Sequence, residues 1–335
     1  MNTEAKLIKK IARALPSSSP RSGGSGLRLG IGDDAAIIVQ NRGIDWVLSC
    51  DAFLEGVHFL ADMHPADSVG YKALVRAASD LAAMGATPRL FLLTLALPSE
   101  RTGKWLDEFL RGMGRAARSQ GMRLAGGDTT KAESISISIT VLGEVSAGKA
   151  VRRSGARPGD IIYVSGKLGR AQLGLELMQR GAGGQMRFAE VVRPHLYPHI
   201  RVELGRWLAE RRIASAMMDL SDGLSTDLER LTSASRVGGR IYAERIPHVT
   251  IPAGLGKFVP GINPDSLHLA LHGGEDYELL FTVSAHKVRQ LSRAPEFREL
   301  TAIGEITGDK RIALVRPDGK AKPLASQGWD PFRKS

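Results

Sequence analysis

Hydrophobic and polar residues alternate most regularly between Ser134 and Val145, in the run SISISITVLGEV. A period of two residues is typical of a strand that buries one face. The apolar run from Phe91 to Leu97 predicts a buried strand, and the periodicity from Glu100 to Ser119 predicts an amphipathic helix. Strands and helices therefore already alternate in this part of the chain.

The first 90 residues contain further elements of both kinds. The pattern predicts a helix over Glu4–Leu15, strands over Ala35–Gln40 and Trp46–Cys50, and a helix that Asp67 caps, that runs to Met84 and that Gly85 ends. The segment PSSSPRSGGSG, Pro16 to Gly26, consists of turn-forming residues and predicts a loop. We expect this loop to form a mobile cover beside the first acidic motif described below.

A change of composition predicts a domain boundary. The segment from Ser146 to Asp160 is rich in Gly, Arg and Pro, so we divide the chain into an N-terminal domain, residues 1–148, and a C-terminal domain, residues 149–335. Beyond the boundary the pattern predicts strands over 160–166, Ala214–Met218, Tyr277–Val283 and Ala302–Thr307, and helices over Ala171–Arg180, His199–Arg211 and Leu224–Ser235. The alternation in both halves indicates the α/β or α+β class.

Composition excludes several classes of protein. A chain of 335 residues with 43% hydrophobic content is long enough for two globular domains. The longest apolar stretch, Leu90 to Pro98, is too short to span a bilayer, and the N-terminus lacks the cleavage site of a signal peptide. The single cysteine excludes an intramolecular disulfide and a Cys-based zinc site. We therefore expect a cytoplasmic protein without a membrane partner.

The net charge of +11 raises the question of nucleic-acid binding. However, the basic residues are mostly Arg spread along the chain, with no block of five like charges and no segment in which aromatic and basic residues are interleaved. This distribution favours a solvated basic surface, and we expect no nucleic-acid partner.

Six short segments contain acidic residues among small and apolar ones, with almost no basic residue beside them. They read GIGDDAAII, LSCDAFLEGVHF, AASDLAAMGA, AGGDTT, MMDLSDGL and HGGEDYELLF. Apolar flanks place each acid at a strand end or on a half-buried helix face, where a carboxylate is costly unless a cation pairs with it. Since no neighbouring Lys or Arg is evident, we expect metal ions as partners. Adjacent glycines let a ligand approach the backbone, so the combination predicts several hard cations that hold a polyphosphate.

The common phosphate-binding loops are absent. None of the Gly-Lys pairs is followed by Ser or Thr, so there is no P-loop, and no G-x-G-x-x-G lies in a strand–turn–helix context. The protein-kinase signatures and H-E-x-x-H are absent as well. Metals held by carboxylates would then have to neutralise the phosphates of a nucleotide.

Some of these acids also allow a purely structural interpretation. Asp33 and Asp34 are adjacent, so their side chains point to opposite sides of an extended backbone, and the pair alone is typical of a turn. Asp80 lies in mid-helix near the apolar face, where either metal ligation or an ion pair with Arg76, one turn earlier, would explain it. Both interpretations remain open at this point.

In SCDAFLEGVHF, Cys50 and Asp51 end an apolar strand, and Glu55-Gly56 makes a turn before His58. A lone His in apolar company is usually a core residue, but its closeness to Asp51 makes a functional role equally reasonable. Cys50 lacks the positive neighbour that activates a nucleophilic thiol.

Three motifs follow further along the chain. Gly126–Thr130 predicts a turn whose amides cup an anion, with Asp128 toward a metal. DLSDGL places Asp219 and Asp222 where a strand becomes a helix; Ser221 or Asp222 would cap that helix, whose N-terminus would also favour phosphate. No Lys or Arg occurs between Lys257 and Lys287, which we expect to leave Glu275 free to recognise a cationic or hydrogen-bond-donating ligand.

The motifs GIGDDAAI, SCDAFLEGVHF, SDLAAMGATP, GGDTT, RSGARPGD, DLSDGL and HGGEDYELLF, in this order, resemble those of the bacterial thiamine-monophosphate kinases. The resemblance extends from about Gly30 to the terminal GWDPF. GGEDYEL together with EGVHF distinguishes this family from the related aminoimidazole-ribonucleotide synthetases, selenophosphate synthetases and hydrogenase-maturation proteins. The resemblance implies a two-domain aminoimidazole-ribonucleotide-synthetase-like fold, in which domain 1–148 binds ATP and Mg²⁺ and pairs its sheet across a homodimer.

The same resemblance implies direct transfer of the γ-phosphoryl group of ATP onto thiamine phosphate, giving thiamine diphosphate, with several Mg²⁺ ions. It implies metal ligation by Asp34, Ser49, Cys50, Asp51, Asp80, Asp128, Asp219 and Asp222. It implies ATP contacts from Gly127, Asp128, Arg153 and Ser221, and thiamine-phosphate contacts from His58, Glu275 and Trp329. The family usually has Thr where this chain has Cys50; a hard Mg²⁺ does not favour a thiol, so this contact would come from the backbone carbonyl or be missing.

The chemistry of such a reaction agrees with the residues. The acceptor is itself a phosphate, whose second pKa is about 6, so it is largely an anion at neutral pH and needs no general base. Catalysis would consist of positioning and charge neutralisation, without a catalytic residue beyond the metal ligands. Trp329 could stack on one ring of thiamine, and Glu275 could pair with the other.

Two alternatives are kept. One is a different ATP-dependent synthetase of the same superfamily, from which the acceptor residues His58, Glu275 and Trp329 would distinguish this chain. The other is a non-enzymatic nucleotide- or nucleic-acid-binding protein that uses the basic charge. The second alternative predicts affinity that falls steeply with salt, and it leaves the acidic motifs unexplained.

Overall fold

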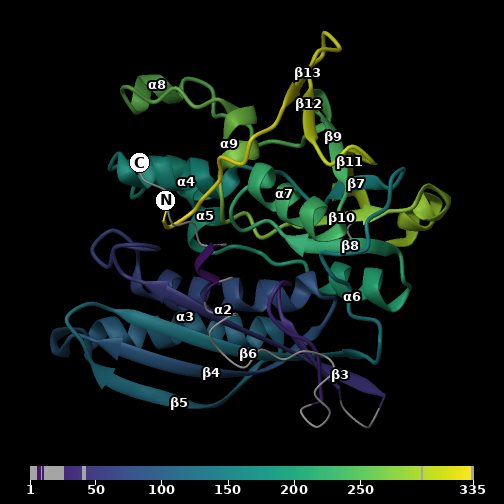
Figure 1. Cartoon of the computed structure of the whole chain (residues 1–335). Coiled ribbons are helices and arrows are strands. Elements are labelled where there is room, and N and C mark those ends of the chain that lie inside the picture. The colour runs from purple at the N-terminus through teal and green to yellow at the C-terminus, as the bar shows by residue number, and fades with distance from the viewer. Residues whose placement is uncertain (1–5, 9, 11–25, 40–42, 296, 333–335) are drawn as a thin grey trace.

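The computed structural model describes residues 6–8, 10, 26–39, 43–295 and 297–332, and these form two mixed α/β halves with one sheet each (Figure 1). The N-terminal sheet has the strand order β1-β2-β3-β6-β4-β5. Its strands are β1 Leu27–Leu29, β2 Ala36–Val39, β3 Ile44–Leu54, β4 Thr87–Leu97, β5 Arg123–Lys131 and β6 Ser136–Ser146. Helices α2 (Ala66–Ala83) and α3 (Lys104–Gln120) cover one face of it, and the 3-10 helix η1 (Ser99–Arg101) precedes α3.

The C-terminal sheet has seven strands in the order β13-β12-β9-β11-β7-β10-β8. They are β7 Ile161–Val164, β8 Ala214–Asp219, β9 Gly238–Tyr242, β10 Leu279–Val283, β11 Thr301–Thr307, β12 Ile312–Val315 and β13 Ala321–Pro323. The helices of this half are α4 Arg170–Gln179, α5 Ala189–Leu196, α6 Val202–Glu210, α7 Leu224–Ser235, α8 Leu255–Phe258 and α9 Ser266–His272, with 3-10 helices η2 Met186–Phe188, η3 Ala243–Arg245, η4 Ala285–Arg293 and η5 Phe297–Glu299. Both sheets mix parallel and antiparallel pairs, which confirms the predicted class.

Helix α2 lies between the two halves. One side of it packs against α3 and the N-terminal sheet, and the other side packs against α6 and β8 (Figure 1). Gly205 of α6 permits the close crossing, because a Cβ at this position would lie 2.1 Å from the carbonyl oxygen of Ala82. The last turn of α2 is therefore held beside the C-terminal half, where strand β8 ends.

The register of the N-terminal sheet assigns its side chains to two faces. One row of residues crosses strands β3, β6, β4 and β5 and consists of Ala52, Ser138, Thr94 and Asp128. Residues of one row share a face, and the next row lies on the other face. Because Thr94 is exposed and its neighbour Leu93 is buried among the core residues below α2, this row lies on the face that the helices leave open.

The structure corrects several predicted elements. Gly126–Thr130 is no turn but the middle of β5, an edge strand exposed along its whole length. Pro65, and not Asp67, is the N-cap of α2; the Asp67 carboxylate accepts hydrogen bonds from Arg115 and from Tyr197 Oη. Pattern reasoning missed these features because both depend on partners distant in sequence.

The boundaries of other elements differ by a few residues from the prediction. The helix predicted from Glu100 is divided into η1 and α3, the one predicted from His199 begins at Val202, and the strand predicted from Tyr277 begins at Leu279. Helix α7 has the predicted bounds. The sequence pattern did not predict strands β1, β9, β12 and β13 or helices α5, α8 and α9, since each is short.

The expectations for the N-terminus are not tested. The helix Glu4–Leu15 and the loop Pro16–Gly26 lie largely outside the described residues. Division into domains 1–148 and 149–335 stays a proposal. Among the described residues, no helix is long and apolar enough to cross a membrane.

Candidate functional site

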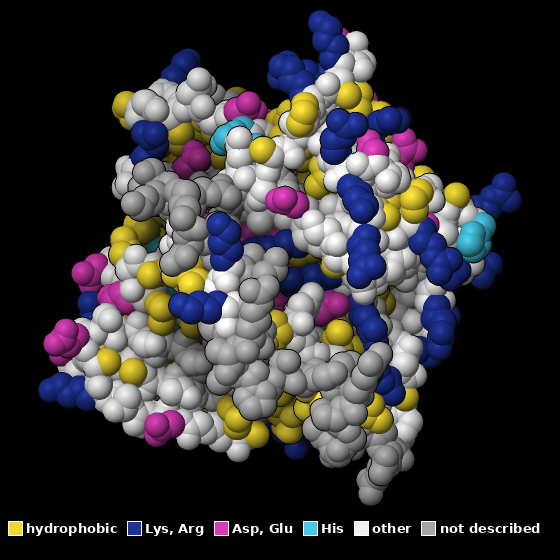
Figure 2. Space-filling view, in the orientation of Figure 1, with side chains coloured by type: hydrophobic (Ala, Val, Ile, Leu, Met, Phe, Trp, Pro, Cys, Tyr) yellow, Lys and Arg dark blue, Asp and Glu magenta, His cyan; other side chains and the backbone are white. Residues whose placement is uncertain are grey.

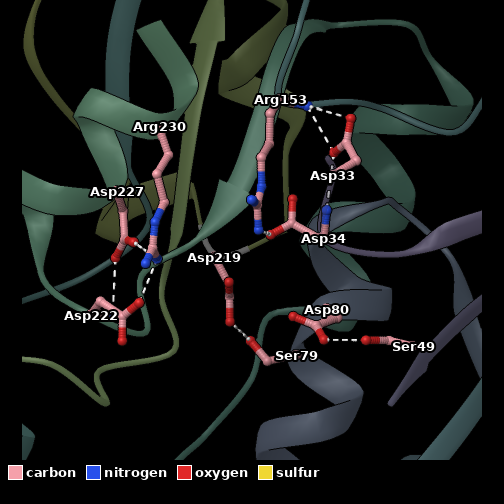
Figure 3. A network of polar contacts seen from close by, with 10 residues as sticks. All are labelled: Asp33, Asp34, Ser49, Ser79, Asp80, Arg153, Asp219, Asp222, Asp227 and Arg230. Carbon is pink, nitrogen blue, oxygen red and sulfur yellow. Dashed lines mark hydrogen bonds and ion pairs between the residues drawn. The ribbon is translucent and has the colours of Figure 1, made fainter. Parts of the chain in front are cut away.

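Three carboxylates from distant parts of the chain meet between the two halves. Asp34 lies in the turn before β2, Asp80 in the last turn of α2 and Asp219 at the end of β8. One oxygen from each lies within 4.8 Å of the other two. Figure 3 shows the three side chains facing one another, so three of the predicted metal ligands are brought together.

Each carboxylate of this cluster has one polar partner among the described residues. Arg153 donates from Nη2 to Asp34 Oδ1 at 2.7 Å. Ser79 donates from Oγ to Asp219 Oδ2 at 2.7 Å, and Ser49 donates to Asp80 Oδ2 at 2.5 Å. The two hydroxyl groups carry no charge, so Arg153 is the only direct cationic partner among these three contacts.

Asp33 takes part through the backbone. Its carboxylate accepts the N–H of Arg153, at 3.0 Å from Oδ1, and the N–H of Asp34 at 3.1 Å. The predicted alternative of a turn acid therefore describes Asp33, while its neighbour Asp34 faces the cluster. Asp33 and Asp34 together fix the segment that carries Arg153 against the turn before β2, because one binds its backbone and the other its side chain (Figure 3).

Crowded carboxylates in this site hold protons more tightly than free ones. Burial, followed by the charge of Asp34, raises the pKa of Asp219 to about 7. Burial and then the charges of Asp51 and Asp219 raise the pKa of Asp80 well above its ordinary value. Burial and Asp34 raise the pKa of Asp33 to about 6. The protein therefore supplies less positive charge here than its carboxylates require.

The cluster fits a hard divalent cation. Asp34 Oδ2 is buried and accepts no hydrogen bond from any part of the chain that the structure describes. The neighbouring groups are carboxylate and hydroxyl oxygens, which are the ligands that Mg²⁺ prefers. An orphaned, buried carboxylate oxygen among other carboxylates is what a cation site needs.

A second acidic group lies at the start of α7. Arg230 forms ion pairs with Asp222 and, at 3.0 Å, with Asp227. Asp227 Oδ2 accepts the N–H groups of Asp222 and Gly223 at 3.0 and 3.1 Å. The predicted capping by Ser221 or Asp222 is therefore wrong, because the N-cap residue is Gly223 and Asp227 binds the backbone ahead of it. Asp222 is compensated by Arg230 rather than joined to the three-carboxylate cluster (Figure 3).

Asp51 has a cationic partner of its own. Arg76 Nε lies 3.3 Å from Asp51 Oδ2. One interpretation of the sequence paired Arg76 with Asp80, but in the structure its ion pair is with Asp51. The guanidinium lies over the ring of Phe53, and its Nε and Nη1 are buried without a hydrogen-bond partner among the described residues. Asp51 points toward α2, on the same side as Ser49.

Cys50 and Asp128 lie on the open face of the N-terminal sheet. Cys50 precedes Asp51 on β3, and its Sγ contacts the hydroxyl groups of Ser138 and Thr140 across that face. Asp128 lies in the row of Ala52, three strands away, which is roughly 14 Å at the usual strand spacing. In a single chain these two side chains are therefore not brought to the Asp34–Asp80–Asp219 cluster, and neither is Gly127 beside Asp128.

Glu275 is not free, which corrects the expectation from the sequence. Lys72 Nζ lies 2.7 Å from Glu275 Oε2, and His195 Nδ1 lies 3.3 Å from the same oxygen. Burial alone would raise the pKa of Glu275, but the charge of Lys72 and the hydrogen bonds from His195 and Lys72 hold it below its ordinary value. The carboxylate is thus kept ionised.

His58 and Trp329 are far apart in the sequence, but both lie beside the acidic residues of this site. His58 Nδ1 accepts the N–H of Leu54 at 3.0 Å, and burial, followed by the charge of Arg76, lowers the pKa of His58 to about 4. Trp329 is 48% exposed, and its backbone N–H donates to the carbonyl of Asp222 at 2.9 Å. The imidazole is therefore neutral with its proton on Nε2, and the indole has an exposed face.

The sequence suggested that the acidic motifs lack basic partners, and the folded chain shows that several have one. The pairing cations come from elsewhere in the chain: Arg153, Arg76, Arg230 and Lys72. Arg153 and Lys72 lie 119 and 203 residues from the acids with which they pair, and contacts at such separations leave no periodic pattern in the sequence. Figure 2 shows Lys and Arg side chains dispersed over the visible face of the molecule rather than gathered in one patch.

Comparison with known proteins gives the chain its relatives. Two family models match, AIR synthase related protein, N-terminal domain, over residues 32–145, and AIR synthase related protein, C-terminal domain, over residues 157–316. A thiamine-monophosphate kinase from Bacillus subtilis (strain 168) is 33% identical over 316 residues, which cover 92% of this chain and 95% of the relative. One from Escherichia coli (strain K12) is 38% identical, with 93% and 94% covered.

Solved structures give the same result at the level of the fold. The structure of AaThiL complexed with AMPPCP and TMP has a TM-score of 0.83 and 31% sequence identity, and the match covers 98% of this chain and 97% of that one. Thiamine monophosphate kinase from Aquifex aeolicus has a TM-score of 0.78 and 30% identity, with 96% and 99% covered. The hydrogenase maturation protein HypE is 20% identical with a TM-score of 0.70, over 88% of this chain and 91% of that one, so it shares the fold.

Proposed function

The chain belongs to the thiamine-monophosphate kinase family, and we propose on that basis that its carboxylate cluster directs in-line transfer of the γ-phosphoryl group of ATP onto thiamine phosphate. It is an enzyme, and its activity is the ATP-dependent phosphorylation of thiamine phosphate. The structure of its relative with AMPPCP and TMP supports these two substrates. Formation of thiamine diphosphate in the cytoplasm, as the last step of its biosynthesis, completes the proposal.

The observation that carries the mechanism is the cluster of Asp34, Asp80 and Asp219. The negative charge of these buried carboxylates exceeds the positive charge of the side chains beside them. Mg²⁺ bound there would neutralise the phosphates and align them, which is the main requirement when two polyanions react. Ser49 and Asp51, on the same side of β3, would complete the oxygen ligands. Cys50 would contribute through its backbone carbonyl, since its thiol lies on the opposite face of the sheet.

The acceptor phosphate is already an anion at neutral pH, so no side chain has to remove a proton from it. The protein's task is to hold the two phosphates in line and to exclude water. Arg153 is placed to bind nucleotide phosphates, because it reaches the cluster from the segment between the halves. Ser221, in the loop that pairs with Glu275, and Asp222, next to it, would lie beside the same phosphates.

The acceptor pocket would be formed by His58, Glu275 and Trp329. His58 Nε2–H is a neutral donor toward a phosphate oxygen. The ionised carboxylate of Glu275 suits the cationic thiazolium or an amino group of the pyrimidine, and the exposed indole of Trp329 suits stacking on an aromatic ring. These three side chains, rather than the acidic cluster, would distinguish thiamine phosphate from the substrates of related synthetases.

A homodimer accounts for the open face of the N-terminal sheet. This face exposes the apolar side chain of Leu92 at 40% exposure, and among the described residues it ends at β5, an edge strand. A second copy would cover both. Asp128 and Gly127, which a single chain keeps away from its own cluster, would then act at the site of the partner.

The test measures ADP release in Mg²⁺ with ATP and, separately, thiamine phosphate, thiamine or an aminoimidazole-ribonucleotide precursor. We expect turnover with thiamine phosphate alone and thiamine diphosphate as product. Turnover with the ribonucleotide precursor instead would favour the synthetase alternative, and turnover with thiamine but not its phosphate would refute the proposed acceptor. Asp219→Asn is the inactive control, because it removes one carboxylate of the cluster and keeps the volume of the side chain.

A further inference from the structure

A buried polar network connects the two halves behind the acceptor pocket. It contains His64 and Lys72 from the N-terminal half and His195 and Glu275 from the C-terminal half. The Lys72 side chain is 3% exposed, and the two histidine residues are 5% and 1% exposed. A buried ammonium group is costly to desolvate, so the arrangement requires a reason beyond the stability of the fold.

One choice of histidine tautomers makes all hydrogen-bond donors in this network point toward Glu275. The N–H of Leu60 donates to His64 Nδ1 at 3.1 Å, and His64 Nε2 lies 3.0 Å from His195 Nε2. His195 Nδ1 then lies 3.3 Å from Glu275 Oε2. If both imidazoles are neutral and carry their protons on the side facing Glu275, every one of these groups finds its partner. With the opposite tautomers, His64 Nδ1 would donate to the carbonyl of Leu60 at 3.1 Å and His195 Nδ1 would accept from Lys72 Nζ at 3.4 Å. The N–H of Leu60 would then lose its acceptor, and Glu275 would lose one of its donors.

The neutral state of both rings agrees with their surroundings. Burial, followed by the charge of His195, lowers the pKa of His64 to about 4, and burial and then the charge of Lys72 lower the pKa of His195. The ammonium group of Lys72 therefore carries the positive charge of the network. Glu275 carries the negative charge.

The two contacts of the network with Glu275 are both made to the same carboxylate oxygen. Lys72 and His195 both reach Oε2, whereas no described residue donates to Oε1. The side chain is 24% exposed, so it is not enclosed by the protein. One oxygen is therefore fixed, and the other is available to a ligand.

The backbone at Glu275 is strained in support of this placement. Glu275 and Tyr277 have φ angles of 67° and 51°, in the left-handed region that side chains with a Cβ rarely adopt. Such a conformation is costly, and it persists only where the surroundings hold it. The N–H groups of Glu275 and Tyr277 donate to the carbonyls of Ser221 and Leu220, at 2.8 and 2.9 Å, which fixes the segment against the loop that follows β8.

We propose that Lys72, His195 and His64 are positioning residues that lock Oε2 of Glu275, so that Oε1 faces the acceptor substrate in a fixed orientation. The proposal rests on the proposed function, in which Glu275 contacts thiamine phosphate. The segment that carries His64 also carries His58, so the same network holds two acceptor-site residues in fixed relation across the two halves. In this proposal Lys72 and the two network histidines act through Glu275 and contact neither substrate nor metal.

The first test is a double-mutant cycle of Lys72→Met and Glu275→Gln, with KM measured separately for thiamine phosphate and for ATP. A hydrogen bond to a charged group contributes about 1.5–3 kcal/mol, so we expect Lys72→Met to raise the KM for thiamine phosphate about tenfold or more. The KM for ATP should change less than about twofold, because the nucleotide residues lie elsewhere. In the Glu275→Gln background, Lys72→Met should add almost nothing, since it acts through Glu275.

The second test distinguishes the two nitrogens of His195. His195→Asn places an amide N–H near the position of Nδ1 and keeps the bond to Glu275, whereas His195→Gln places it near Nε2 and loses that bond. We expect a raised KM for thiamine phosphate in His195→Gln and a KM near the wild type in His195→Asn. This pair answers the question even if Lys72→Met does not fold.

Lys149→Met is the matched control. Lys149 Nζ lies 2.7 Å from Glu210 Oε2, so this ion pair has the same length as that of Lys72, but it is partly exposed and involves neither Glu275 nor the network histidines. It should leave both KM values unchanged. Wild-type protein that does not phosphorylate thiamine phosphate would refute the proposed function and this inference together. Active wild-type protein with equal KM values in His195→Asn and His195→Gln, or additive effects in the cycle, would overturn the inference alone.

Discussion

Asp219→Asn should make the protein more stable when Mg²⁺ is absent, although it removes a residue of the site. Asp219 is 3% exposed and its pKa is raised to about 7, first by burial and then by Asp34. The asparagine keeps an oxygen that accepts from Ser79 and carries no charge. The substitution therefore removes repulsion within the cluster without removing the hydrogen bond.

The magnitude follows from the difference between the pKa in the folded chain and the ordinary value of 3.8. One pKa unit corresponds to about 1.4 kcal/mol, so ionised Asp219 destabilises the fold by up to about 4 kcal/mol. Neighbouring carboxylates share this shift, so we expect a gain of about 2–4 kcal/mol in the free energy of unfolding. In a chain of 335 residues that corresponds to a rise in Tm of roughly 3–6 °C.

The gain depends on pH with a definite sign. The pKa of Asp219 is higher in the folded than in the unfolded chain, so the folded chain binds more protons between about pH 4 and pH 7, and stability is lost as pH rises through this window. The full advantage of Asp219→Asn should therefore be seen at pH 8, and less than half of it at pH 5. Adding Mg²⁺ at pH 8 should reverse the order, because the ion stabilises only the chain that binds it.

The assay is thermal unfolding in EDTA or Mg²⁺ at pH 5 and pH 8, with Asp318→Asn as control. Asp318 lies in an exposed turn, and its side chain is 52% exposed, so its substitution should change stability by less than about 0.5 kcal/mol. If Asp219→Asn were less stable than the wild type in EDTA at pH 8, or if its gain did not vary with pH, the interpretation of the cluster as uncompensated charge would be wrong.

Three further predictions concern the partners of the acids. Asp51→Asn should destabilise the protein by about 1–3 kcal/mol in EDTA, the opposite of Asp219→Asn, because it leaves the buried guanidinium of Arg76 unpaired; chemical denaturation measures the difference. If Asp128 acts at the site of the partner subunit, inactive Asp128→Asn and Asp219→Asn proteins, co-refolded in equal amounts, should regain about a quarter of wild-type activity, and no recovery would contradict action in trans. Gly205→Ala should lower Tm by several degrees, since its Cβ would lie 2.1 Å from a carbonyl oxygen of α2, and an unchanged Tm would argue against the close crossing.

The sequence predicted the acids but not what surrounds them. The alternation of strands and helices gave the class of fold, and the acid motifs included Asp34, Asp80 and Asp219, which the chain brings together. The pairing of Asp34 with Arg153 joins residues 119 apart, and that of Lys72 with Glu275 joins residues 203 apart. Such contacts depend on how the halves are placed, which periodicity does not encode.

The segment around Asp128 was misjudged for a different reason. Gly126 and Gly127 are typical of a turn, and their sequence gives no sign that the chain stays extended. In the structure they lie on β5, which pairs in parallel with β4, and Gly127 passes so close to β4 that a Cβ would lie 1.8 Å from the carbonyl of Leu93. Here glycine serves close approach of two strands, and tertiary packing overrides the local preference.

The cations that the sequence did not reveal sharpen the case for metal ions rather than weaken it. The site and its border contain eight carboxylates and four cationic side chains, namely Asp33, Asp34, Asp51, Asp80, Asp219, Asp222, Asp227 and Glu275 against Lys72, Arg76, Arg153 and Arg230. With every carboxylate ionised, eight less four leaves four negative charges. The pKa of Asp227 is raised as well, but the raised pKa values of Asp33, Asp80 and Asp219 place most of this excess at the centre. The cations pair mainly with the acids around it: Asp51, Asp222 and Glu275. Two divalent ions would balance the excess before a nucleotide adds its own phosphates, so the protein's Arg and Lys side chains leave the centre of the site to Mg²⁺.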